Sequence, residues 1–317
     1  MRAKLCKTIA LSGLFISLFC SSLEAIIAEY VKDSIHLVSV MYHYNNQLSL
    51  ERPGNLWVDN LGNLYVLDLS HQMIFIYNDK LQPLTRLGKV NGLHKPVDMT
   101  TDEEGNVYVS DADKGILVFN SIGKAIRTID IRQITEGKVQ FVTDLMIDES
   151  KLLYMATGTD QGVLLLDAHN NIKKKIIPQD ILKEGSSPVP IPISRMTMDS
   201  DGKLYLLSEE IGKIYVYTDP DTFSFQFGQK GGSFGKLSRP AGIAVDASKK
   251  LIYVIDYMRH TLLIYNMDGV FLEEYGGKGR GDGWFNHPGQ ICLDKNRQLI
   301  VADTFNHRLQ VLSIRPR

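Results

Sequence analysis

The sequence predicts an all-β fold built from six repeated units of four strands, and three observations lead to this prediction. First, one pattern recurs six times: an apolar run that ends in an aspartate, a polar turn, and a second apolar run. Second, these aspartates are spaced by 43, 46, 51, 47 and 48 residues; they are Asp59, Asp102, Asp148, Asp199, Asp246 and Asp294. Third, apolar residues do not recur at helical spacing over any long window. Repeats of roughly 40–50 residues with four strands each are typical of β-propeller blades.

The first two units read "RPGNLWVDNLGNLYVLD" from Arg52 and "KPVDMTTDEEGNVYVSD" from Lys95. In both, the turns "DNLGN" and "DEEGN" separate two strands, and a third strand follows as "MIFIY" or "ILVFN". Units three and four are weaker copies, "VTDLMIDESKLLYMAT" and "ISRMTMDSDGKLYLLS". Units five and six, "RPAGIAVDASKKLIYVIDYMRHTLLIY" and "HPGQICLDKNRQLIVADTFNHRLQVL", are close to each other. A fourth strand follows in most units, for example Val270–Gly276.

The sixth unit ends after three strands, because the chain stops at Arg317. Near the other end, Ser34–Tyr44 ("SIHLVSVMYHY") has the composition of a strand but precedes the first unit. We expect this segment to pair with Arg308–Ser313 as the missing fourth strand. A ring that is closed in this way leaves no open sheet edge, and it couples the two ends of the chain.

The residues of these units resemble a known family. The segments "ADTFNHRLQVL" and "IDYMRHTLLIY", together with the linkers "GDGWFNHP" and "GKLSRP", are similar to NHL repeats. The resemblance is strong in units 1, 2, 5 and 6 and weaker in units 3 and 4. It implies a six-bladed β-propeller. It leaves function open, because such propellers include protein-binding platforms, RNA-binding platforms and metal-dependent enzymes.

The N-terminus has the three parts of a secretory signal. Arg2, Lys4 and Lys7 precede an apolar run from Ile9 to Cys20, and "SSLEA" then ends at Ala25. We therefore expect residues 1–25 to be a cleaved signal peptide, residues 26–317 to be a single propeller domain, and the protein to be secreted or periplasmic.

Two alternatives to cleavage are a retained membrane anchor and a lipid on Cys20. The apolar run of 12 residues is short for an anchor, which needs roughly 20 residues to span a bilayer. Phe19 stands where lipid-attachment signals have a small residue. Cleavage is the prediction that we keep, with no stable membrane insertion afterwards.

Charge and cysteine content exclude some classes of partner and site. Cleavage removes three of the 35 basic residues and one of the 36 acidic ones, which leaves a net charge of −3. This balance does not favour binding to nucleic acid. Cleavage also leaves Cys292 as the only cysteine, so the chain has neither an internal disulfide nor a cysteine-based zinc site.

The histidines do not predict a metal site. One relative of this fold, the lyase that completes peptide amidation, carries a zinc site built largely from histidines, and zinc needs three or four converging ligands. Here no three histidines occupy equivalent positions of the innermost strands: His260 and His307 lie in turns, and His94 and His287 precede the prolines at unit starts. Structural or surface roles are the better interpretation.

A second aspartate recurs at the end of the second strand in units 1, 2, 5 and 6, as Asp68, Asp111, Asp256 and Asp303. We expect these carboxylates to hold the following turn by hydrogen bonds. Arg259 and Arg308 lie a few residues further on and are candidate ion-pair partners.

The long connection from Pro178 to Ser194 accounts for the 51-residue spacing. Its prolines favour an extended segment. Two roles stay open, a loop for a partner at the rim and a cap over the weaker units.

One position predicts a ring of polar side chains. The residues two places after the proline that starts each unit, or its equivalent, are Asn55, Asp98, Asp144, Arg195, Gly242 and Gln290. Because each blade contributes its first strand to the axis, these residues should meet at one mouth of the channel. Asn55, Asp98 and Asp144 are candidate ligands for Ca²⁺ or Mg²⁺. Alternatively, Arg195 neutralises Asp98 or Asp144 and the ring binds no metal.

These observations favour a noncatalytic binding or scaffold propeller that presents its faces and its channel mouth to a protein, peptide or glycan. The alternative is a divalent-cation-dependent hydrolase, lactonase or lyase that acts at the channel mouth. No complete catalytic constellation is present in the sequence, so no catalytic residue is predicted.

Overall fold

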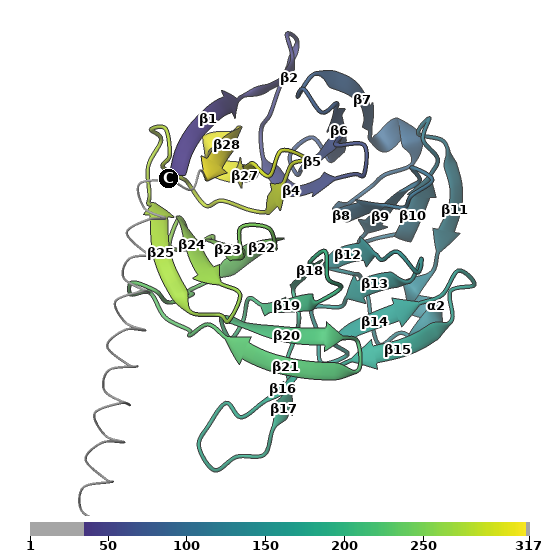
Figure 1. Cartoon of the computed structure of the whole chain (residues 1–317). Helices are drawn as coiled ribbons and strands as arrows, with labels where there is room; N and C mark the ends of the chain where they lie inside the picture. Colours follow the sequence, from purple (N-terminus) through teal and green to yellow (C-terminus); the bar gives the residue numbers. More distant parts are fainter. Residues whose placement is uncertain (1–34, 315–317) are drawn as a thin grey trace, which may run out of the picture.

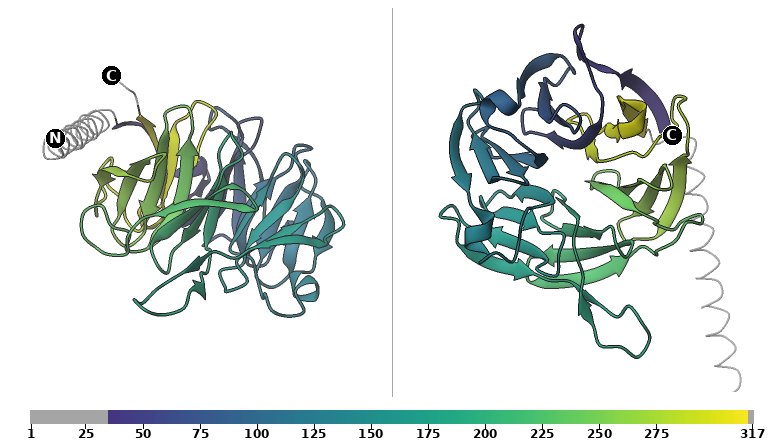
Figure 2. Two further views of the ribbon diagram at one scale, coloured as in Figure 1. Left: turned by 60° about the horizontal axis from the view of Figure 1, so that its bottom comes forward. Right: turned by 180° about the vertical axis from the view of Figure 1, so that it is seen from behind.

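The computed structural model describes residues 35–314, which form a ring of six antiparallel four-stranded sheets (Figures 1 and 2). The signal-peptide prediction falls on residues outside this range. Blades 1 to 3 consist of β4 (Pro53–Val58), β5 (Leu64–Asp68), β6 (Met73–Tyr77) and β7 (Pro83–Leu87); β8 (Pro96–Thr101), β9 (Val107–Asp111), β10 (Gly115–Phe119) and β11 (Ala125–Ile129); β12 (Asp144–Ile147), β13 (Leu153–Ala156), β14 (Val163–Leu166) and β15 (Ile172–Ile176). Blades 4 to 6 consist of β18 (Arg195–Met198), β19 (Leu204–Ser208), β20 (Lys213–Asp219) and β21 (Thr222–Phe227); β22 (Pro240–Asp246), β23 (Leu251–Asp256), β24 (Thr261–Asn266) and β25 (Phe271–Gly276); β26 (Ile291–Leu293), β27 (Leu299–Asp303), β28 (Arg308–Ile314) and β1 (Ile35–Met41). The prediction of a six-bladed β-propeller is therefore confirmed.

The remaining elements are short. They are the hairpin β2 (His43–Asn45) with β3 (Leu48–Ser49), the hairpin β16 (Gln179–Asp180) with β17 (Val189–Pro190), the one-turn helix α2 (Ile131–Ile134), and the 3₁₀ turns η1 (Lys89–Asn91) and η2 (Thr304–Asn306). Within residues 35–314, no helix has the length and apolar character needed to cross a bilayer.

Strands from both ends of the chain close the ring. β1 pairs antiparallel with β28, with Ile35 opposite Ile314 and Met41 opposite Leu309, so the two strands lie side by side in Figure 1. Ile35 and Ile314 are both buried in the apolar cluster between blades 5 and 6. The predicted pairing of the N-terminal segment with the last blade is confirmed.

The core consists of six apolar clusters, one between each pair of neighbouring blades. Alternate residues of one strand serve different clusters, because successive side chains point to opposite faces of a sheet. In β5, Leu64 and Val66 pack toward blade 6, whereas Tyr65 and Leu67 pack toward blade 2. A blade therefore buries its apolar side chains against a neighbour on each side.

The repeated anchor aspartates shape the turn between the first two strands of each blade. Asp59 is typical, since its carboxylate accepts hydrogen bonds from the backbone N–H groups of Leu61 and Asn63 and from the hydroxyl of Tyr65. Asp148 and Asp199 accept from tyrosines at the same offset. The regular spacing seen in the sequence thus reflects one local interaction repeated in each blade.

The insertion after blade 3 forms the hairpin β16–β17, which projects from the ring (Figure 1). Its far end is exposed, including Ile181 and Leu182, while Ile191 and Ile193 on the returning segment are buried between blades 3 and 4. The returning segment of the insertion therefore packs against blades 3 and 4, which is one of the two roles expected for the insertion.

Deletion of residues 35–45 should destabilise the whole ring, because it removes β1 and leaves β28 with an unpaired edge. We expect a lower melting temperature and concentration-dependent association in analytical ultracentrifugation.

The control deletes residues 183–187, which lie in the exposed loop of the β16–β17 hairpin, and it should melt like the unmodified protein. A β1 deletion that stays monomeric and melts at the unmodified temperature would show that closure by β1 contributes little.

Candidate functional site

The innermost strands all begin on one face of the ring, which we name the front face. It carries the connections into the innermost strands and the turns between the second and third strands. The predicted polar residues lie at these strand starts: Asn55 in β4, Asp98 in β8, Asp144 in β12, Arg195 in β18, Gly242 in β22 and Gln290 immediately before β26.

The structure brings four of them together around the guanidinium of Arg195. Its Nη2 donates to Asn55 Oδ1 at 3.0 Å, its Nε donates to the Ala241 carbonyl at 3.1 Å, and its Nη1 donates to the Thr143 carbonyl. Nη1 also lies 3.5 Å from Asp144 Oδ1. Arg195 of blade 4 therefore contacts blades 1, 3 and 5 across the axis. We name Asn55, Asp98, Asp144 and Arg195 the channel cluster.

The two acids of the channel cluster join neighbouring blades. Asp98 Oδ2 accepts a hydrogen bond of 2.7 Å from the Leu145 N–H in blade 3, and its Oδ1 accepts one of 3.1 Å from Asn55 Nδ2 in blade 1. In the same way, Asp144 Oδ2 accepts one of 2.8 Å from the Met196 N–H in blade 4. Both acids are buried, so these bonds replace lost hydration.

Burial raises the pKa of Asp98 to about 6, although Arg195 and the bonds from Leu145 and Asn55 oppose this shift. Burial, followed by repulsion from Asp98, raises the pKa of Asp144 well above its ordinary value, against the attraction of Arg195. One guanidinium cannot neutralise two ionised carboxylates at this depth. The pair therefore holds a proton to a higher pH than exposed aspartates do.

Gln290 occupies a different place. Its Oε1 accepts from the backbone N–H of Ile291 at 3.2 Å, and a Cβ at position 242 would lie 2.1 Å from that oxygen. Gly242 is thus required by the close approach of Gln290 from the next blade. Within the described chain, no hydrogen bond links the Gln290 side chain to the channel cluster.

The channel cluster separates two cavities. One, of about 210 Å³, is lined largely by apolar residues of the innermost strands, including Trp57, Met198 and Leu293, with Asp98, Asp144 and Gln290 at its polar end. The other, of about 240 Å³, opens on the front face and has Asn55 and Arg195 at its floor. We name the second one the front cavity.

The rim of the front cavity carries a cluster of three rings flanked by two arginines, which sequence reasoning missed. Arg52 lies 5.4 Å from the ring centre of Phe305, and Arg239 lies 5.4 Å from that of Tyr257. His287 packs against both rings, 5.1 Å from Phe305 and 4.7 Å from Tyr257, and these two rings lie 6.4 Å from each other. We name these five residues the arginine–aromatic arc. It comes from blades 1, 5 and 6.

Buried aspartates hold the arc in place. Asp68 accepts hydrogen bonds from the backbone N–H of Arg52, and Asp256 accepts them from that of Arg239. Each carboxylate also accepts from the N–H groups of the turn that follows it, such as Met258 and Arg259. The expected role of these aspartates in fixing turns is confirmed, and the same bonds position both arginines.

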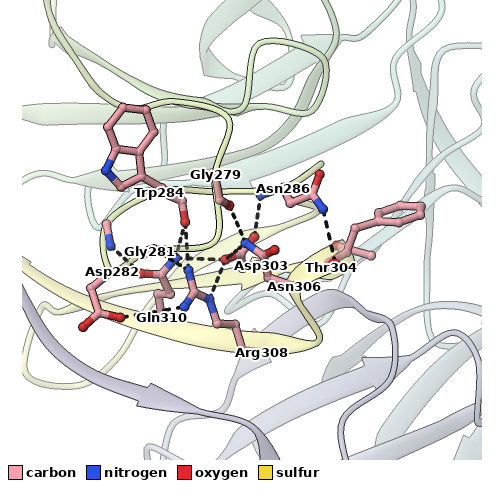
Figure 3. Close-up of polar contacts among 12 residues, drawn as sticks. Gly279, Gly281, Asp282, Trp284, Asn286, Asp303, Thr304, Asn306, Arg308 and Gln310 are labelled. Carbon is pink, nitrogen blue, oxygen red and sulfur yellow. Dashed lines mark hydrogen bonds and ion pairs between the residues drawn. The ribbon is translucent and has the colours of Figure 1, made fainter.

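Asp303 in blade 6 is held differently (Figure 3). Arg308 Nε donates to its Oδ2 at 2.7 Å, and the amides of Asn306 and Gln310 donate to the same oxygen, each at 2.9 Å. The Asn286 N–H donates to Oδ1, and Asn286 Nδ2 donates to the Phe305 carbonyl. This network fixes the η2 turn that presents Phe305 to the front cavity.

The two arginine pairings proposed from the sequence have different outcomes. Arg308 pairs with Asp303, as expected. Arg259 instead pairs with Glu274 on the outer strand β25, so the expectation that it pairs with Asp256 is wrong. Backbone N–H groups already surround the Asp256 carboxylate, which leaves no need for a guanidinium there.

A hydrogen bond links His260 to His287 of the arc. The backbone N–H of His287 donates to the ring nitrogen Nδ1 of His260 at 2.8 Å. An acceptor cannot carry a proton, so this hydrogen bond requires Nδ1 of His260 to be unprotonated. Burial, with a smaller effect of nearby positive charge, lowers the pKa of both His260 and His287. Within residues 35–314, no group of three or more His, Cys, Asp or Glu side chains is arranged to hold a metal ion.

One feature of the sequence points to the arc. The dipeptide Arg-Pro stands at the start of units 1 and 5, as Arg52–Pro53 and Arg239–Pro240. A residue directly before an innermost strand must lie at a channel mouth, so the repeated Arg-Pro predicts two arginines at one opening.

Comparison with known proteins supports the fold. Residues 285–312 match the NHL repeat model, and residues 184–276 match a model described as 6-bladed beta-propeller. No curated protein sequence matches the chain.

Solved structures with similar folds have different functions. An auxiliary nutrient binding protein from Bacteroides thetaiotaomicron aligns with a TM-score of 0.65 and 14% identity, over 88% of this chain and 76% of that one. Virginiamycin B lyase from Staphylococcus aureus aligns with a TM-score of 0.58 and 13% identity, over 89% of this chain and 100% of that one. At these identities the likeness concerns the fold alone. Together with the blades described above, the matches identify the chain as a six-bladed β-propeller with an NHL repeat in its last blade.

Proposed function

We propose that this protein is an exported, noncatalytic binding propeller that holds a protein, peptide or glycan at the front cavity. The observation that carries the proposal is the closure of the channel by Arg195 directly beneath an exposed arginine–aromatic rim. A closed floor under a concave, partly aromatic opening is a typical geometry for ligand binding. Export is the part of the proposal that rests on the sequence of residues 1–25 alone.

The lining of the front cavity favours binding over catalysis. Glu209 is its only carboxylate apart from groups beneath the floor, and it is engaged by Arg239. Thr304 donates its hydroxyl to the Pro53 carbonyl at 2.8 Å and not to a general base. No nucleophile and general base lie together among these lining residues, which covalent catalysis would require.

The cation-dependent alternative needs free oxygen ligands in the channel. Both oxygens of Asp98 and the Oδ2 of Asp144 already accept hydrogen bonds from the backbone or from Asn55, and the Oδ1 of Asp144 faces the Arg195 guanidinium at 3.5 Å. A divalent cation would have to displace this guanidinium. The channel cluster therefore supports a structural role for these residues better than a metal-binding one.

Ligand binding should be visible in a thermal-shift screen of short peptides and oligosaccharides at millimolar concentration. Saturation to a hundred times Kd stabilises a protein by about 2.7 kcal/mol. We expect at least one probe to raise the melting temperature of the unmodified protein and to lose this effect in Phe305→Ala, because Phe305 lines the front cavity.

The matched control is Phe223→Ala, which removes an exposed phenylalanine from the outer strand β21 and should keep the effect. The proposal fails if every probe leaves the melting temperature unchanged, or if Phe305→Ala responds as Phe223→Ala does.

Calcium and magnesium should not bind to the channel cluster. Titration with either cation at millimolar concentration should produce no heat in calorimetry and no change in melting temperature. Saturable heat that is absent in the double variant Asp98→Asn with Asp144→Asn would instead support the cation-dependent alternative.

A further inference from the structure

We propose that the ligand of the front cavity carries a carboxylate next to an apolar or aromatic group, and that Arg52 binds this carboxylate. A peptide that ends in an apolar residue with a free C-terminus has this chemistry. The inference rests on the proposed function, because it names the ligand class of the same cavity.

Among the arginines of the front cavity, Arg52 is the one that forms no ion pair with a described residue. Of the three arginines that line it, Arg239 pairs with Glu209, and Arg195 lies 3.5 Å from Asp144. Within residues 35–314, no carboxylate lies within ion-pair distance of Arg52. The neighbouring Glu51 lies on the side of His71, at 3.8 Å from its ring nitrogen. The cavity therefore has an excess of one positive charge at its rim.

The geometry prepares Arg52 for an anion. Its backbone N–H is held by the buried Asp68, and its guanidinium lies over the ring of Phe305. Within residues 35–314 this guanidinium donates no hydrogen bond, so its planar fork of donors is free to match the two oxygens of a carboxylate. Contact with the ring also reduces the side-chain entropy that binding would otherwise cost.

The rest of the rim offers apolar contact. Phe305 and Leu69 are each 38% exposed and both line the front cavity, as does Tyr257. The hydroxyl of Thr304 is already bonded to Pro53. An apolar side chain that enters here would cover exposed aromatic surface.

The size of the front cavity suits one residue. Its volume of about 240 Å³ is below the roughly 300–1,000 Å³ that is usual for drug-sized ligands. The closed floor at Arg195 prevents a chain from threading through the axis. A chain terminus fits a cavity that is closed in this way, because it needs no exit on the far side.

The test measures binding of acetyl-Gly-Gly-Phe with a free C-terminal carboxylate, and of the same peptide as its C-terminal amide, by isothermal titration calorimetry. We expect the acid to bind at least tenfold more tightly than the amide, with an affinity that falls as salt is raised. Phenylpropionate and a trimer of galacturonic acid serve as further arms, which separate a peptide from a small aromatic acid and from a sugar acid.

Three variants locate the charge. Arg52→Ala should weaken binding of the acid about 10- to 100-fold, and Arg52→Lys should restore part of it, because lysine keeps the charge but loses the planar fork. The control Arg86→Ala removes an exposed arginine from the outer strand β7 of the same blade, and should leave the affinity unchanged.

The outcomes separate this inference from the proposed function. Equal affinity for acid and amide, or equal behaviour of Arg52→Ala and Arg86→Ala, overturns the carboxylate inference while the binding function stands. Tighter binding of the sugar acid than of the peptide acid overturns the peptide source. Absence of binding by every probe, together with a negative thermal-shift screen, overturns both proposals.

Discussion

The centre of this propeller depends on the hydrogen bonds and the ion pair that the guanidinium of Arg195 forms at the axis. A ring of blades places six innermost strands around one axis, and here two buried aspartates and an asparagine meet at that axis. Without a cation the two acids would repel each other in a site of low polarity. Arg195 provides the positive charge and also bonds to backbone carbonyls of blades 3 and 5. The same residue therefore stabilises the ring and closes the channel.

Closure of the channel determines where a ligand can bind. The floor at Arg195 turns the front face into a shallow cavity instead of a passage, and the rim above it is formed by segments from blades 1, 5 and 6. Asp68, Asp256 and Asp303 hold those segments by hydrogen bonds to the chain before the innermost strands. Residues that stabilise individual blades thus also position the side chains of the candidate site. These bonds position the rim before a ligand binds, and such preorganisation lowers the entropic cost of binding.

Much of the fold could be predicted from the sequence, because each blade repeats one turn stabilised by an aspartate such as Asp59. Closure by β1 followed from a repeat that lacked one strand.

The candidate site was harder to predict from the sequence, since radial symmetry predicts which positions meet but not which side chains form hydrogen bonds. Gln290 was expected among the polar ring, yet it turns toward the space left by Gly242. Arg52 and Arg239 are far apart in sequence, and the Arg-Pro dipeptide repeated at the starts of units 1 and 5 is the sequence signal that places them at a common rim. Arg259 was misassigned because backbone donors already fill the carboxylate of Asp256.

The most direct test of the role of Arg195 is the free energy of unfolding in urea, measured from pH 5 to pH 8 for the unmodified protein and for Arg195→Met. Because the pKa of Asp98 is raised to about 6 in the folded state, the folded protein binds more protons than the unfolded chain between about pH 4 and 6, so stability should fall as pH rises through this range. Loss of Arg195 should raise the pKa of both acids further and steepen this fall. The variant should then be less stable by about 3–5 kcal/mol at pH 8, with a smaller difference at pH 5. A variant that matches the unmodified protein at pH 8, or that differs by the same amount at every pH, would contradict the account.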